Sequence, residues 1–166
     1  MSGELTVKYI GDYMQMDFPH RKPQKSDLPQ NIMDSLSIKP KEILKSRDYI
    51  LVYENENQIK DIEINKELFD KKNLDPGGVV ITSKSETADI ASRYFVPQCS
   101  FFEDPVTGST HCSLVPYWSE KLEKTKLKCI QLSDRGGEMI CEDVGNRVLI
   151  NGKAVTYFEG HIHLKH

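Results

Sequence analysis

Apolar and polar side chains alternate in two short segments at the start of the chain, residues 4–10 and 13–19. Alternation with a period of two residues is typical of a strand that buries one face. Gly11 and Asp12 separate the two segments, and a pair of this kind favours a tight turn. We therefore predict that residues 4–19 form a β-hairpin.

The rest of the N-terminal half predicts short elements of both kinds. Apolar residues recur at helical spacing around Pro29, and proline is well tolerated in the first turn of a helix, so a short helix is expected over residues 28–36. Residues 65–72 are weakly helical, residues 54–58 are a polar loop and residues 75–78 are a turn. Continuous apolar runs predict buried strands at residues 47–53, 79–82 and 90–96.

A longer helical pattern occupies residues 105–124. Leu114, Trp118 and Leu122 recur at fourfold spacing, and Cys112 and Val115 widen the apolar face. Strand patterns then return at residues 127–132, 138–142, 146–150 and 154–159, separated by turns that contain glycine. This order of elements predicts an α+β fold, rich in antiparallel strands, around one long apolar helix.

Length, composition and charge narrow the class of protein. The chain has 166 residues, of which 38% are hydrophobic, and this is enough to bury the core of one domain. Its 22 basic and 25 acidic residues give a net charge of −3, without the basic footprint of a nucleic-acid-binding protein. No apolar run is long enough for a membrane helix, and the first residues lack the pattern of a signal peptide. We therefore expect one cytoplasmic domain that binds neither nucleic acid nor membranes.

The cysteines and histidines do not predict a metal site. The four cysteines are far apart and form no Cys-x-x-Cys pair: Cys99, Cys112, Cys129 and Cys141. Reduced and mostly buried thiols are therefore expected. Histidines at positions 161, 163 and 166 favour the polar face of an edge strand or a frayed tail. His111, in the predicted helix, is expected to be packed or to line a cleft.

The segment from Asp104 to Thr110 contains residues suited to chemistry. Thr107, Gly108, Ser109 and Thr110 form a turn at the start of the predicted helix, where unpaired backbone N–H groups favour a carboxylate or a phosphate. Gly108 lets a ligand approach the backbone, and Asp104 stands where it could exchange a proton with that ligand. A purely structural interpretation makes Asp104 an N-cap, residue 105 the first helical position and Ser109 a solvated hydroxyl. Spacing alone leaves both interpretations open.

Motifs along the chain resemble the signature of the phenazine-biosynthesis PhzF-like family. Residues 92–97 read Ser-Arg-Tyr-Phe-Val-Pro, residues 102–111 read Phe-Glu-Asp-Pro-Val-Thr-Gly-Ser-Thr-His, and residues 116–118 read Pro-Tyr-Trp. Residues 131–138, 145–148 and 152–155 continue in family order, and residues 2–5 and 16–19 resemble the start of the family's second half. The resemblance covers nearly the whole chain, although residues 25–75 agree only in pattern.

The resemblance implies a diaminopimelate-epimerase-like fold, in which two similar lobes each wrap a small open β-barrel around a central helix. Residues 1–166 would be the second lobe, with residues 1–19 as its opening strands and residues 105–124 as its central helix. The family moves a proton on a small carboxylic acid without a metal or an organic cofactor. By this resemblance Asp104 would be the acid/base partner, and Gly108 and Ser109, within the turn 107–110, would bind the substrate carboxylate or relay a proton. Arg135 and Gly136 would border the cleft.

The family's first-lobe motifs do not occur upstream in this sequence. These are a Ser-Glu-Thr-Ala-Phe segment with the main catalytic glutamate and a Cys-Gly-His-Ala segment. Residues 85–88 repeat the letters Ser-Glu-Thr-Ala, but at a loop position of the second lobe, so we take this as coincidence.

Two functions are therefore open. The chain is expected to be a lobe of a cofactor-independent isomerase, either a piece of a longer protein or a short protein that completes its site with another chain. A homodimer or a complex with a first-lobe chain is expected. Alternatively, it is a non-catalytic remnant that binds a carboxylate or associates with proteins through the face left bare.

Overall fold

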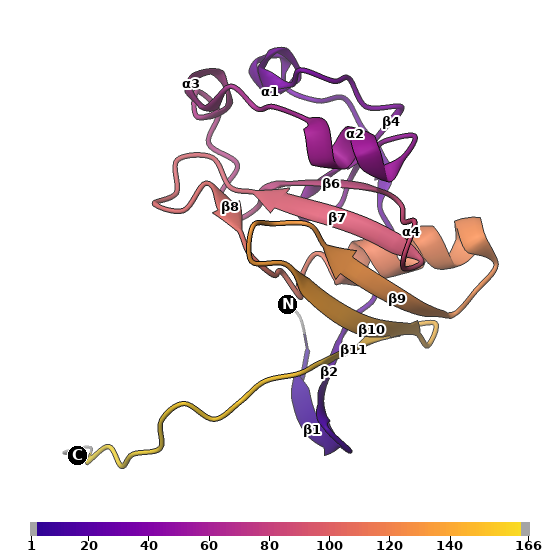
Figure 1. Cartoon of the computed structure of the whole chain (residues 1–166), viewed down its shortest axis with the longest axis vertical. Helices are drawn as coiled ribbons and strands as arrows, with labels where there is room; N and C mark the ends of the chain where they lie inside the picture. Colours follow the sequence, from indigo (N-terminus) through magenta and orange to yellow (C-terminus); the bar gives the residue numbers. More distant parts are fainter. Residues whose placement is uncertain (1–2, 164–166) are drawn as a thin grey trace.

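The chain folds into one mixed β-sheet flanked by helices, an α+β arrangement (Figure 1). The structure is a computed structural model and describes residues 3–163. Its first elements are β1 (Thr6–Ile10), β2 (Tyr13–Pro19), β3 (Gln24–Lys25), α1 (Gln30–Ser35), β4 (Glu42–Lys45), β5 (Tyr49–Val52), α2 (Glu56–Asp61) and α3 (Lys66–Phe69). They are followed by β6 (Val79–Lys84), β7 (Ile90–Phe95), β8 (Glu103–Asp104), α4 (His111–Leu122), β9 (Lys126–Gln131), β10 (Gly137–Asp143) and β11 (Arg147–Gly152).

The sheet has eleven strands, ten of them in the order β1-β2-β11-β10-β9-β7-β6-β5-β4-β3, with β8 paired to β7 off this path. The pairs β5/β6 and β7/β9 are parallel, and the other pairs are antiparallel. Within residues 3–163 the outer strands β1 and β3 each pair on one side only, so the sheet is not a closed barrel. The antiparallel-rich α+β fold expected from the sequence is thus confirmed.

The two faces of the sheet are covered by different helices. In β5, Ile50 and Val52 pack on the core around α4, whereas Tyr49 and Leu51 pack on a second core with residues of α1, α2 and α3. Successive side chains of a strand point to opposite faces, so a strand buried on both sides needs an apolar residue at every position. This explains the unbroken apolar run of β5. None of the helices in the described part of the chain is long and apolar enough to cross a membrane.

The predicted hairpin at the start of the chain is confirmed. β1 and β2 pair in antiparallel register, with Ile10 opposite Tyr13 across the turn. The hairpin projects from the body of the fold (Figure 1), and Val7 and Tyr9 of β1 are 56% and 76% exposed. β1 therefore leaves apolar side chains bare instead of burying one face.

The long helix begins later than its sequence pattern predicts. α4 spans His111–Leu122, not residues 105–124, and its N-cap is Thr110. Asp104 lies in β8 and is paired with Tyr94 of β7. Because β8 is held to the sheet, residues 105–110 form a connection and not the first helical turns. The helix ends at Glu123, whose left-handed backbone (φ 52°) stops it.

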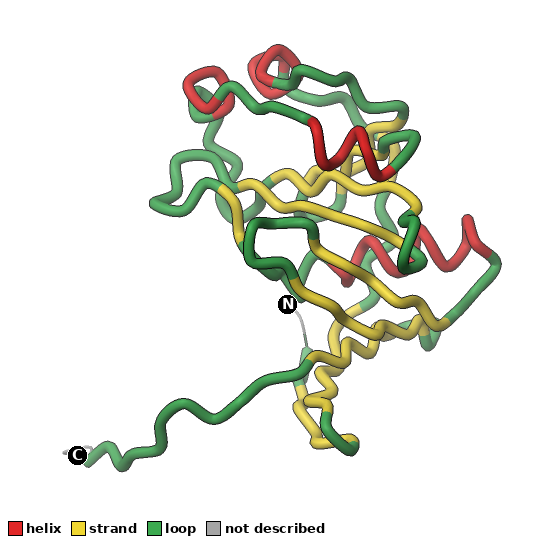
Figure 2. Tube along the Cα trace, viewed as in Figure 1, coloured by secondary structure: helices red, strands yellow, loops and turns green. Residues whose placement is uncertain are grey.

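Two further segments differ from prediction. Residues 54–58, predicted as a loop, contain the start of α2, because the Asn55 side chain accepts a hydrogen bond from the Gln58 N–H and caps this helix. Residues 154–159, predicted as a strand, have no regular structure, and Figure 2 shows the C-terminal segment as a loop leading away from the sheet. Val155 and Tyr157 are 92% and 100% exposed, since no strand lies beside them among the described residues. His161 and His163 lie in the same exposed segment, and Ser2 and His166 are outside the described residues.

Candidate active site

The connection between β8 and α4 is held in place by one side chain at the end of β9. Gln131, which is buried, accepts a hydrogen bond from the N–H of Thr107 at 2.8 Å and donates one to the carbonyl of Asp104 at 2.5 Å. The Thr107 hydroxyl in turn donates to the Asp104 carboxylate at 2.6 Å. These bonds fix the direction of the Asp104 side chain. Asp104 is therefore not the N-cap of the helix, which excludes that structural interpretation.

The turn Gly108–Thr110 presents backbone donors that the fold does not use. The first helical N–H groups, those of His111 and Cys112, already bond to the carbonyls of Gly108 and Ser109. By contrast, within residues 3–163 the N–H groups of Gly108, Ser109 and Thr110 donate to no protein acceptor. Consecutive free N–H groups at the head of a helix form a concave site for anions. The unpaired N–H groups suited to the anion site expected at the start of the helix thus lie in the turn before it.

A positively charged side chain that the sequence did not single out lies beside this turn. Arg47, between β4 and β5, donates to the Ser109 hydroxyl at 3.1 Å and forms an ion pair with Asp48 at 3.0 Å. Asp48 is buried and also accepts hydrogen bonds from the Gly78 N–H and the Tyr94 hydroxyl. Burial opposes the charge of Arg47, but the attraction of Asp48 outweighs it and raises the pKa of the guanidinium. Arg47 therefore places a permanent positive charge beside the turn, and its ion pair with Asp48 holds it there.

Three of the predicted site residues meet in one open cleft of about 810 Å³: Gly108, Arg135 and Gly136. The cleft is also lined by Met16 of β2, by Val106 and by residues at the start of β10. Asp104 and Ser109 do not line this cleft and lie half-buried beside it.

Thr107 and Thr110 are directed inward. The Thr107 hydroxyl bonds to Asp104, and the Thr110 hydroxyl donates to the Thr107 carbonyl at 2.9 Å. Both side chains are buried, so they shape the turn and do not face the solvent.

Close packing brings the Arg135–Gly137 loop against the Asp104–Gly108 connection. A Cβ atom at Gly137 would lie 2.3 Å from the Cγ2 atom of Val106, so only glycine fits there. The Ser133 hydroxyl donates to the Pro105 carbonyl at 2.7 Å and accepts from the Gly136 N–H at 3.1 Å. Gly136 has φ +67°, which favours glycine. The glycines of the sequence motif thus set the width of the cleft.

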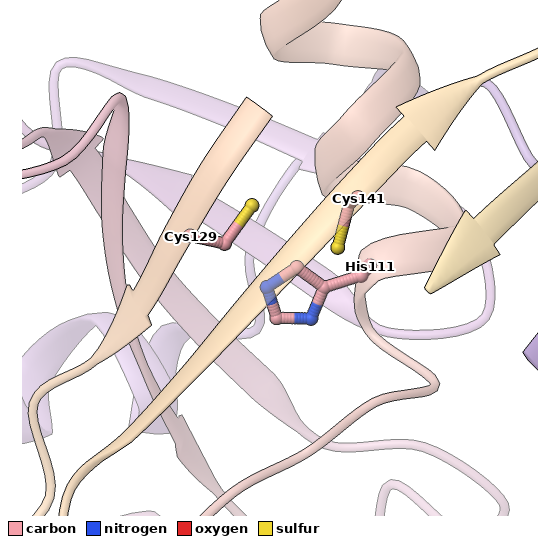
Figure 3. Close-up of side chains that lie close together, drawn as sticks. All are labelled: His111, Cys129 and Cys141. Atoms are coloured by element: carbon pink, nitrogen blue, oxygen red, sulfur yellow. The ribbon is translucent and has the colours of Figure 1, made fainter. Parts of the chain in front are cut away.

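A group of possible metal ligands lies behind the turn, in the core. His111, Cys129 and Cys141 are close together and fully buried, although their spacing in the sequence predicted no metal site (Figure 3). Arg47 and Gln131 were likewise missed as site residues. The alternation of the two strands could have shown that Cys129 and Cys141 both point into the core. Their closeness could not be predicted, because it depends on the register of the strands.

Comparison with known proteins identifies the relatives of this chain. The family model for PhzC-PhzF phenazine biosynthesis-like proteins matches residues 14–160. An uncharacterized isomerase of Pseudomonas aeruginosa is 40% identical over 98% of this chain and 62% of its own length. A mouse phenazine biosynthesis-like domain-containing protein is 32% identical over 96% of this chain and 62% of its own length. The chain thus spans less than two thirds of the length of these relatives.

Solved structures agree with this grouping. A PhzC/PhzF phenazine biosynthesis protein of Clostridium difficile is 38% identical and superimposes with a TM-score of 0.83 over 96% of this chain and 61% of its own. A PhzF-family protein of Enterococcus faecalis is 34% identical, with a TM-score of 0.84 over the same shares. On the extent of these matches and on the motifs that build the cleft, the chain belongs to the PhzC/PhzF phenazine biosynthesis-like family.

Proposed function

We propose that the chain forms one side of the active site of a PhzF-like isomerase that moves a proton on a small carboxylic acid. The observation that carries this proposal is the turn Gly108–Thr110, whose free N–H groups stand beside Arg47 and next to the cleft. Backbone N–H groups and a guanidinium are the donors that a carboxylate prefers. Two relatives are named uncharacterized isomerases, which supports an isomerisation.

Each part of this site has a role in the proposal. The N–H groups of Gly108, Ser109 and Thr110 hold the substrate carboxylate, and Arg47 adds positive charge beside it. Asp104 acts as the acid/base group, with one carboxylate oxygen engaged by the Thr107 hydroxyl and the other left for the substrate. The Ser109 hydroxyl binds the carboxylate or relays the proton, and Arg135 and Gly136 form the facing wall.

Proton transfer between two faces of a carbon needs a second acid/base group opposite Asp104. We propose that this group comes from a further lobe, in a two-lobed diaminopimelate-epimerase-like arrangement in which this sheet is the open barrel around α4. The greater length of the relatives supports this. The apolar side chains left bare on β1 and on residues 155–162 provide a surface for that lobe or for a second copy of the chain. We place this activity in the cytoplasm, where the four free thiols stay reduced.

The test follows the exchange of substrate C–H for deuterium from solvent by NMR. The chain is mixed with a polypeptide that carries the Ser-Glu-Thr-Ala-Phe and Cys-Gly-His-Ala segments, and small carboxylic acids are screened. Asp104→Asn should lower the exchange rate by about 10²–10⁴-fold, because a general acid/base group contributes this much. Asp27→Asn changes an exposed aspartate elsewhere and should leave the rate unchanged.

Anion binding is tested separately on the chain alone. Acetate or benzoate should shift the backbone amide signals of residues 108–110 first, and Arg47→Lys, which keeps the charge but loses the fork of the guanidinium, should weaken binding. Carboxylate binding without exchange in any mixture would favour a non-catalytic binding module. Exchange that survives Asp104→Asn would contradict the role given to Asp104.

A further inference from the structure

Three side chains with metal-binding atoms converge in the core beneath the turn Gly108–Thr110. His111 is the first residue of α4, Cys129 lies in β9 and Cys141 in β10, and Figure 3 shows the imidazole close to the two thiols. Their ligand atoms all lie within 4.8 Å of one another, and all three residues are 0% exposed. The proposed acid/base mechanism uses none of them.

The imidazole is held as a metal-binding histidine would be. The Nδ1 atom of His111 lies 3.0 Å from the carbonyl oxygen of Thr107. A carbonyl can only accept, so Nδ1 carries the proton and Nε2 offers its lone pair. Nε2 is buried and has no hydrogen-bond partner within the described residues. An unpaired buried nitrogen destabilises the fold, and a backbone carbonyl on the other nitrogen is the usual support of a histidine ligand.

The strand register places the two thiols on the same face of the sheet but not directly opposite. Cys129 pairs with Met139 and Cys141 with Leu127, so the cysteines are diagonal neighbours. Diagonal Cα atoms are about 7–8 Å apart in an antiparallel pair. A disulfide requires about 4.4–6.8 Å, so it would need the strands to move. The register therefore disfavours a disulfide between them.

A zinc ion fits the same positions with little movement. Zinc bonds to sulfur at about 2.3 Å and to nitrogen at about 2.0–2.1 Å, so tetrahedral geometry separates two sulfur ligands by about 3.8 Å. From separations of up to 4.8 Å, the two sulfur atoms would approach each other by at most about 1 Å, and nitrogen and sulfur by at most about 1.3 Å. Two thiolates and a neutral imidazole around a divalent ion also carry no net charge, which suits a buried site better than a monovalent ion would.

We propose that the Nε2 atom of His111 and the thiolates of Cys129 and Cys141 bind one zinc ion in a structural site. Binding releases the two thiol protons to solvent, and the three side chains occupy three of the four positions of the tetrahedron. The ion joins the head of α4 to β9 and β10, behind the turn Gly108–Thr110. This inference does not depend on the proposed isomerase activity, because it concerns the core and not the cleft.

The experiment uses the full chain refolded with metal, because buried ligands leave a folded chain no direct way to take up an ion. The chain is unfolded under reducing conditions and refolded with Co²⁺, which reports thiolate ligands by an intense sulfur-to-cobalt charge-transfer band in the near ultraviolet. We expect one cobalt per chain, replaced by zinc on titration, and one zinc per chain after expression with zinc. Cys129→Ser and Cys141→Ser should each remove or greatly weaken the band.

Cys112→Ser and Cys99→Ser are matched controls among the cysteines outside the cluster and should retain the band. Cobalt bound by the exposed His161 and His163 would give no sulfur band, which separates such binding from the proposed site. Folded wild-type chain with neither the band nor stoichiometric zinc would overturn the proposal, whether or not the variants fold. A measured mass lower by two hydrogens, with Cys129 and Cys141 joined in a disulfide, would also overturn the proposal.

Discussion

Replacing Gly137 by alanine should disturb the cleft through a single contact. The new Cβ would lie 2.3 Å from Cγ2 of Val106, 3.1 Å from its Cγ1 and 3.3 Å from its Cβ. Because both methyl groups and the Cβ are too close, rotation of the stiff valine side chain does not relieve the overlap. The connection of residues 105–108 must therefore move away from β10, and Gly108 moves with it.

The size of the effect follows from two opposing contributions. Forcing an extra methyl group into a packed site costs about 1–3 kcal/mol. Gly137 does not have positive φ, so alanine can adopt its backbone, and the loss of freedom in the unfolded chain returns about 0.4–1 kcal/mol. We expect Gly137→Ala to lower the free energy of unfolding by about 1–2 kcal/mol. Acetate should also shift the amide signals of residues 108–110 less than in wild type.

Urea denaturation of a double-mutant cycle isolates the contact. Val106→Ala removes both methyl groups near the new Cβ, so the double variant should recover about 1–2 kcal/mol relative to the sum of the single changes. Gly152→Ala is the matched control: it also lines the cleft, but its Cβ would meet nothing within 4 Å. If the losses of unfolding free energy in the two single variants add up to that of the double variant within about 0.5 kcal/mol, the reasoning is refuted.

Two predictions concern the opposite side of the sheet and the core. In the folded chain burial opposes the charge of Glu56, but hydrogen bonds from Lys60 and Ser85 prevail and lower its pKa. Its contribution to stability is therefore present above the unfolded pKa and lost as pH falls through the lowered pKa of the folded chain. Glu56→Gln should flatten the acid side of the plot of urea stability against pH, and an unchanged acid side would contradict this. Thr82→Val should cost about 1–3 kcal/mol by leaving the Trp118 indole N–H, now 3.0 Å from the Thr82 hydroxyl, unpaired, whereas Thr82→Ser should largely preserve stability.

The elements that the sequence predicts well are those whose pattern reports burial directly. The apolar run around β5 predicts a strand because both of its faces are covered, by α4 on one side and by α1–α3 on the other. The period-two alternation of β2 and the turn after Ile10 predict the hairpin for a similarly local reason. The run from Asp104 to Thr110 identified the candidate site because its residue types, glycine above all, suit a close turn whatever surrounds it.

The features that the sequence does not predict depend on distant partners. Residues 105–110 carry a helical pattern, but pairing of β8 with β7 and the side chain of Gln131 hold them in another conformation. Residues 154–159 alternate like a strand and have no neighbouring strand to pair with among the described residues. Arg47 and the His111–Cys129–Cys141 group become visible only when the sheet brings separate segments together.

The run from Thr107 to His111 has two parts with different roles, buried side chains and a partly exposed backbone. The side chains of Thr107, Thr110 and His111 are all buried, and the Thr107 carbonyl accepts hydrogen bonds from both the Thr110 hydroxyl and the His111 ring. Gly108 and Ser109 alone are half-exposed, and their backbone N–H groups have no protein acceptors among the described residues. Most side chains of this motif thus hold the turn from inside, and the proposed ligand binding falls to the backbone and to the Ser109 hydroxyl. A substitution at Thr110 or His111 would accordingly act on ligand affinity through the shape of the turn, although neither side chain lines the cleft.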